Sequence, residues 1–183
     1  MSPLDKVKAI VAHIKATNLE VISDPGLSSV EILNAFKAIK LLPPSEIIEL
    51  YQWHNGIGEL DCYLNFMNLR DAIMWYLRFK SCYAENDNYY CGWNRDWFPL
   101  LNMNNDILLC LNFKTLSIAR IIQTEDLCET VAWHYIQYLD ALLYMFDNKL
   151  FEFDDFGDNF GCIEFDRQEW NKMLHLHQIK SPW

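Results

Sequence analysis

The first third of the chain repeats apolar residues at helical spacing three times. Apolar positions three and four residues apart predict a helix over residues 4–14. A second helix is expected to begin at a serine cap, Ser28 or Ser29, and to stop before the run 41–44, which ends in two prolines. A third helix is predicted from Ser45 to His54. It is expected to end at Asn55-Gly56, because such a pair readily adopts the left-handed backbone conformation that ends a helix.

Beyond residue 56 the pattern changes to short apolar runs. Residues 60–66 alternate well enough to predict a strand, and Asn68 can cap a helix behind it. Three closely spaced runs then predict an antiparallel meander, in which the middle run is apolar on both faces and is expected to be central. These runs are 97–101, 106–113 and 116–123.

Helical spacing returns towards the C-terminus. It predicts one helix over 131–146 and a last one over 166–179, whereas the polar and aromatic segment 84–96 is expected to be a loop. Strands following helices without strict alternation predict an α+β fold. Because no repeat or flexible linker interrupts the pattern, we expect a single domain over 1–183.

The composition favours a folded protein of the cell interior. Hydrophobic residues make up 51% and aromatic residues 15% of 183 residues, which is enough apolar surface for a core. No apolar run reaches the length of a membrane helix, and the N-terminus lacks a basic segment followed by an apolar one. We therefore expect a cytoplasmic location and six reduced, mostly buried cysteines.

The net charge of −10 is concentrated in one quarter of the chain. Residues 121–166 hold eleven acids against the single base Lys149, whereas the remaining residues hold fourteen of each. Such a segment is expected to repel nucleic acid and anionic membranes and to attract a basic protein.

Four motifs in order resemble the SUKH superfamily of Smi/Knr-type proteins. The "LP, helix, NG" signature is matched by residues 42–56, and the resemblance covers about 28–146, leaving 147–183 as an acidic C-terminal extension. Asn112 stands where the family commonly has an aspartate. The other matching segments are 65–72, 97–100 with 106–112, and 131–139.

The resemblance implies a fold and a class of function. It implies N-terminal helices followed by a curved, mainly antiparallel sheet flanked by helices. Many bacterial members are immunity proteins that neutralise a cognate toxin, often a nuclease, while fungal members are scaffold or regulatory proteins.

The patterns of common catalytic and metal sites are missing. His175 and His177 would point about 200° apart on a helix and could not chelate one ion. The acidic run 152–159 departs from the spacing of a calcium loop, and Gly56-Ile57-Gly58 lacks the third glycine of a dinucleotide fingerprint. We therefore expect neither an enzyme nor a bound metal or cofactor.

These observations give a binding hypothesis. An acidic surface is expected to dock on a basic toxin domain, with no nucleic-acid or membrane partner, and Tyr89 and Trp93 are expected to be exposed aromatic anchors. The alternative is an intracellular scaffold or regulatory module unrelated to toxins, and the oligomeric state is left open. The interface acids predicted are Asp140, Asp147, Asp154, Asp155 and Asp158.

Overall fold

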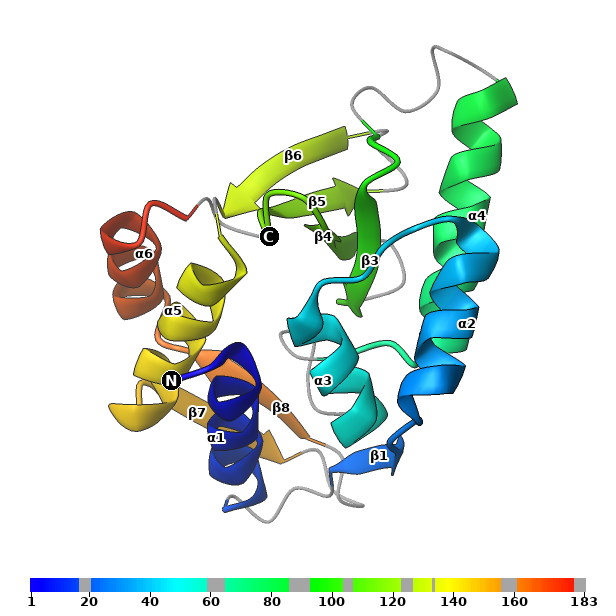
Figure 1. The fold of residues 1–183 in the computed structure, drawn as a ribbon. Helices are drawn as coiled ribbons and strands as arrows, with labels where there is room; N and C mark the ends of the chain where they lie inside the picture. The colour runs from blue at the N-terminus through cyan, green and yellow to red at the C-terminus, as the bar shows by residue number, and fades with distance from the viewer. Residues whose placement is uncertain are drawn as a thin grey trace.

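A computed structural model describes residues 1–16, 21–58, 65–85, 93–103, 107–122, 127–132, 134–155 and 161–179, and it describes only the backbone at 82–85, 127–128, 152–155 and 161–165. The chain has the expected α+β fold (Figure 1). Its helices are α1 (Pro3–Lys15), α2 (Ser29–Ile39), α3 (Ser45–Trp53), α4 (Leu69–Glu85), α5 (Tyr135–Asp147) and α6 (Arg167–Leu176). Its strands are β1 (Ile22–Pro25), β2 (His54–Gly58), β3 (Trp97–Asn102), β4 (Ile107–Asn112), β5 (Ile118–Ile122), β6 (Leu127–Ala132), β7 (Phe151–Asp155) and β8 (Gly161–Phe165).

Helix starts are fixed by side chains that the sequence makes recognisable. The Ser28 hydroxyl accepts a hydrogen bond from the Glu31 amide, and the Glu31 carboxylate accepts one from the Ser28 amide, which forms a capping box at α2. Asn68 caps α4 in the same way, by accepting from the amide of Asp71. The predicted starts of α2 and α4 are thereby confirmed.

The central sheet is an antiparallel meander in the order β3-β4-β5-β6. As predicted, β4 is central, since it pairs with β3 on one side and β5 on the other. The pair β1–β2 is connected to this sheet by two single-residue bridges, Ile57 to Phe66 and Phe66 to Leu101. Of the strand predicted at 60–66, residues 60–64 lie outside the described residues, and Phe66 contributes a bridge.

Two predicted boundaries are wrong. The helix expected from Val131 begins at Tyr135, because Val131 and Ala132 belong to β6, where Ala132 pairs with Ile118. His134 then caps α5 by accepting a hydrogen bond from the Ile136 amide.

The end of the third helix also differs. Helix α3 ends at Trp53, and Asn55 and Gly56 belong to β2 and not to a helix stop. Gly56 still adopts a positive φ of 96°, a conformation that side chains other than glycine rarely take.

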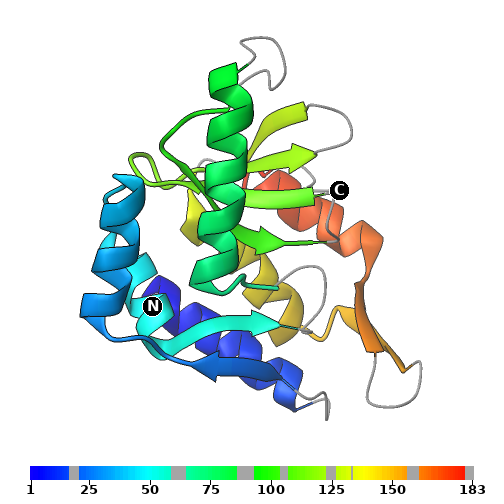
Figure 2. The same cartoon turned by 90° about the vertical axis from the view of Figure 1, so that its right-hand side faces the viewer.

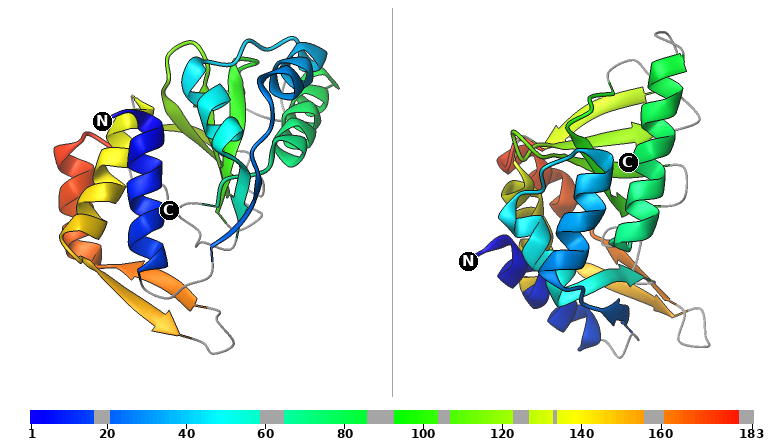
Figure 3. Two further views of the ribbon diagram at one scale, coloured as in Figure 1. Left: turned by 60° about the horizontal axis from the view of Figure 1, so that its bottom comes forward. Right: turned by 45° about the vertical axis from the view of Figure 1, so that its right-hand side comes forward.

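The helices lie on two sides of the four-stranded sheet. Helices α2 and α4 flank one side, while α1, α5 and α6 form a layer on the other (Figures 1 and 3). The β7–β8 hairpin is a separate two-stranded sheet that extends from the end of this second layer (Figure 2).

The segment after α5 belongs to the hydrophobic core. Buried side chains of α6 and the residue behind it join the same apolar cluster as the meander. They are Trp170, Met173, Leu174 and Ile179. The acidic extension is therefore anchored to the body by its last helix.

Two expectations on composition can be compared with the structure. Cys110 lies buried in β4, as expected of the cysteines. No helix among the described residues has both the length and the apolar character needed to cross a membrane.

Candidate functional site

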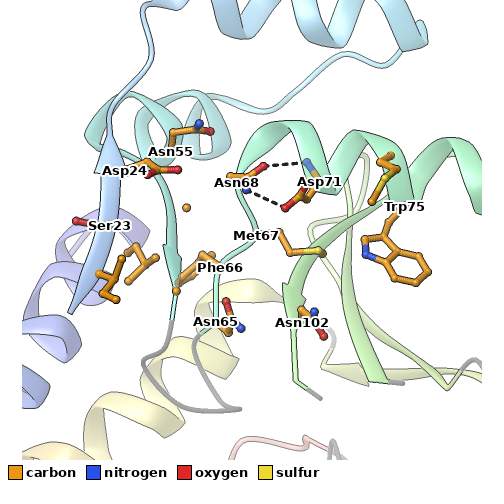
Figure 4. A pocket seen from close by; sticks show the side chains of 15 residues that line it. Ser23, Asp24, Asn55, Asn65, Phe66, Met67, Asn68, Asp71, Trp75 and Asn102 are labelled. Atoms are coloured by element: carbon orange, nitrogen blue, oxygen red, sulfur yellow. Dashed lines mark hydrogen bonds between the residues drawn. The ribbon is translucent and has the colours of Figure 1, made fainter. Parts of the chain in front are cut away.

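A cavity of about 420 Å³ opens between the β1–β2 pair and the start of α4. Its wall carries as many amide and carboxylate side chains as large apolar ones, and Met74 and Trp75 of α4 belong to the apolar part (Figure 4). The labelled polar side chains are Ser23, Asp24, Asn55, Asn65, Asn68, Asp71 and Asn102.

Several of these polar groups already serve the backbone. The Asn55 side-chain oxygen accepts a hydrogen bond from the Leu69 amide at 2.9 Å, and Asn68 and Asp71 bond to each other at the start of α4. A β carbon on Gly56 would lie 2.8 Å from the Asn68 nitrogen, so the close approach requires glycine. Asn55-Gly56 therefore joins β2 to α4, and this structural role accounts for the pair.

The cavity can offer hydrogen bonds. Among the described residues that line it are one hydroxyl, at Ser23, and neither histidine nor lysine. The nearby His54 ring nitrogen bonds the Asp24 carbonyl oxygen at 3.1 Å. Within the described chain, no group of three histidine, cysteine or acidic residues could hold a metal ion.

Two predicted interface acids, Asp140 and Asp147, lie on α5 along its contact with α1. Lys6 forms an ion pair with Asp140, and His13 Nε2 lies 2.8 Å from Asp147 Oδ1. His13 follows Lys6 by the same seven residues that separate Asp147 from Asp140, so α1 and α5 run parallel with matched pairs two turns apart. We call these four residues the α1–α5 seam.

The two pairs of the seam differ in burial. The side chain of Lys6 is 10% exposed and that of Asp140 36%, and burial lowers the pKa of Lys6 from its ordinary value. Asp147 is 57% exposed, while the His13 ring stacks on Phe146 with centroids 6.0 Å apart. Both carboxylates therefore have partners within the fold.

The β7–β8 hairpin carries another group of acids in a defined register. Glu152 pairs with Glu164 across the hairpin, and Asp154 follows Glu152 by two residues. Because alternate residues of a strand share a face, these three residues lie on one face, which we call the acidic hairpin face. Phe151 belongs to the opposite face and packs on Phe146 of α5, with ring centroids 5.1 Å apart.

The remaining predicted site residues divide into two groups. Asp155 lies in β7 but out of phase with Asp154, and Asp158 and Tyr89 fall outside the described residues. Trp93 is described and is 6% exposed, so the expectation of an exposed anchor is wrong. It packs against Phe79 and Tyr76 of α4, with centroids 4.9 and 6.0 Å away, because its apolar area is large enough to fill the space beside that helix.

The sequence contains a signal for the acidic hairpin face besides its acidic composition. Residues 151–154 read Phe-Glu-Phe-Asp, which is the apolar and polar alternation of a strand with one buried face. The acidic composition led to the prediction of an acidic C-terminal extension, in which no strand was expected.

Comparisons with known proteins do not assign the chain to a family. No protein-family model matches the chain, and a search of curated proteins finds no match.

Proposed function

We propose that the protein is a non-catalytic binding domain of the immunity type. It neutralises a basic toxin domain, such as a nuclease, by docking through the acidic hairpin face. The observation that carries the proposal is the register of β7 and β8, which pairs Glu152 with Glu164 and adds Asp154 on the same face.

The register argues for a role outside the fold. Like charges directly opposite each other on an antiparallel pair destabilise it by some tenths of a kcal/mol. A basic partner converts the same arrangement into an attraction. The acids of the seam, by contrast, already have partners in the chain, Lys6 and the His13 ring.

The charge of the surrounding segment supports the same partner class. The net charge of residues 121–166 is −10, and a field of that size speeds the association of a cationic surface. A nuclease must present cations to bind phosphates, so carboxylates on an inhibitor can occupy its cleft and exclude the substrate. The resemblance to SUKH proteins and the α+β architecture are consistent with this role.

The test is protection from the proposed toxin, sought as the C-terminal domain of a protein that a neighbouring gene encodes. We expect co-expression to restore growth, and a pull-down to recover the complex more efficiently at low salt than at high salt. The informative variant neutralises the acidic hairpin face as Glu152→Gln, Asp154→Asn and Glu164→Gln.

A matched control removes three charges elsewhere, as Asp24→Asn, Glu46→Gln and Glu49→Gln on β1 and α3. We expect the hairpin variant to lose protection and the control variant to retain it. If the wild-type protein neither binds nor protects, the immunity role is contradicted and a scaffold or regulatory role is favoured.

A further inference from the structure

A second cavity, of about 530 Å³, lies on the side of the sheet that α2 and α4 flank. It is located between α4 and the turns at 94–96 and 113–115. Four cationic side chains from four separate elements line it, together with one carboxylate. The cations are Lys40, Lys80, Arg95 and Lys114, and the carboxylate is Asp96. A local excess of positive charge is unexpected on a chain of net charge −10.

Most of this positive charge is not compensated within the fold. Lys114 Nζ lies 2.7 Å from Asp96 Oδ2, so this pair is satisfied. Among the side chains that the structure describes, none of Lys40, Lys80 and Arg95 takes part in an ion pair. Three cations therefore face one cavity with no counterion among the side chains that the structure describes.

The backbone around these cations is held by defined hydrogen bonds. The Tyr76 hydroxyl donates to the Arg95 carbonyl at 2.9 Å, and the Phe113 amide donates to the Asp96 carbonyl at 2.8 Å. The Asn112 side-chain oxygen accepts from the Lys114 amide at 2.9 Å, which fixes the turn that carries Lys114. The cavity is thus formed before any ligand binds, which lowers the entropic cost of binding.

The rest of the wall is apolar. Phe113 lines the cavity and packs against Phe36 and Phe98, with ring centroids 5.6 and 5.1 Å away, so its ring has firm support. Leu42 stands at the rim with 84% of its surface exposed, the largest exposed fraction among the large hydrophobic residues described. Phe113 and Leu42 together could cover a flat apolar group of a ligand.

We propose that this cavity binds a small organic anion that carries phosphate groups and an apolar ring, as a nucleoside diphosphate does. Three uncompensated cations exceed what one carboxylate requires and match a group with two or three negative charges. A volume of 530 Å³ falls within the range of about 300 to 1,000 Å³ for small-molecule sites.

The charge of the whole chain favours a small ligand over a nucleic acid. A long polyanion would extend over the acidic regions and be repelled. A small anion responds mainly to charges within a Debye length, about 8 to 10 Å at physiological salt, where the cations of the cavity dominate. This inference is independent of the proposed immunity function.

The experiment is calorimetric titration of the full chain with ADP, pyrophosphate and adenosine as probes. We expect ADP to bind more tightly than either fragment, because only ADP engages both the cations and the apolar wall, and we expect its affinity to fall as salt is raised. Equal affinity for ADP and adenosine would overturn the role of the cations. Equal affinity for ADP and pyrophosphate would overturn the role of the apolar wall.

Paired variants locate the binding. Lys80→Gln with Arg95→Gln should weaken ADP binding by roughly tenfold or more, whereas Lys15→Gln with Arg70→Gln, two exposed cations outside the cavity, should change it less than about twofold. Thermal unfolding of both variants checks that the fold is retained. No saturable binding of ADP, or equal loss in the two double variants, overturns the proposal.

Discussion

The acids of the α1–α5 seam and those of the acidic hairpin face come from the same stretch of excess negative charge but stand in opposite settings. Asp140 pairs with Lys6 and Asp147 with the His13 ring, and both partners lie on α1, 134 positions away in sequence. The backbone register places Glu152 opposite Glu164, another acid, across the hairpin. The first group has partners within the fold, whereas the second brings two acidic positions opposite each other.

This difference shows that net charge alone does not locate an interface. The sequence places eleven acids in residues 121–166 without ranking them. The structure separates acids that have partners in α1 from acids that the backbone register of β7 and β8 places on one face of the hairpin. Substitution in the two groups should therefore have opposite effects on folding and on binding.

The largest expected effect on stability is at Asp140. Asp140→Asn leaves the Lys6 ammonium 10% exposed and without its carboxylate, and should reduce the free energy of unfolding by about 1 to 2 kcal/mol. Partial exposure of Asp140 keeps the loss below that of a fully buried pair. Urea unfolding measures it, and adding Lys6→Met to the same variant should recover part of the loss. A single variant as stable as the wild type would contradict the assigned role.

A smaller effect is expected at the other end of the seam. Asp147→Asn removes a pair whose carboxylate is 57% exposed, so the free energy of unfolding should fall by only about 0.5 kcal/mol, and less at high salt. Urea unfolding at two salt concentrations measures this. A loss as large as that of Asp140→Asn would mean that burial does not distinguish the two pairs.

The acidic hairpin face should respond in the opposite direction. Glu152→Gln with Glu164→Gln relieves a like-charged cross-strand pair, and the free energy of unfolding should rise by about 0.3 kcal/mol. Replicate urea titrations beside the Asp147→Asn variant resolve the sign. A loss of stability would show that these acids, like those of the seam, have partners within the fold.

A pH-dependent effect is expected at Glu31, an acid outside both regions that also serves the fold. Hydrogen bonds from Ser28 lower the pKa of Glu31 from its ordinary value of 4.5. The folded state thus holds this proton less tightly than the unfolded chain, so the stabilisation is present above pH 4.5 and is lost as the pH falls through the lowered pKa. Glu31→Gln should flatten this part of the stability profile, whereas Glu49→Gln, on the exposed face of α3, should leave it unchanged. Equal profiles for wild type and Glu31→Gln would contradict the capping role.

Local signals in the sequence predicted the elements that local chemistry determines. The serine cap of α2, the Asn68 cap of α4 and the antiparallel order of the meander depend on residues close in sequence, and all are found in the structure. Strands β1 and β2 were missed, because each is short and is defined by pairing with the other. The start of α5 was misplaced because Val131 and Ala132 suit either a helix or a strand, and pairing with β5 decides between them.

The candidate site was less predictable because it depends on contacts between distant segments. No local pattern indicates that Asp140 pairs with Lys6 or that the polar surroundings of Trp93 hide a buried ring. The cationic cavity unites residues 40, 80, 95 and 114, whose proximity follows from the packing of α2, α4 and the meander. The register of β7 and β8, by comparison, could have been inferred from the alternation of residues 151–154.

The most direct test is the rate at which the protein associates with the proposed partner, a basic toxin domain sought among the products of neighbouring genes, measured by stopped flow at low salt. Neutralising Glu152, Asp154 and Glu164 should slow association by roughly tenfold or more while leaving the fold intact. The control variant at Asp24, Glu46 and Glu49 should stay within about twofold of the wild type. Equal association rates for the two triple variants would contradict the assignment of the interface to the acidic hairpin face.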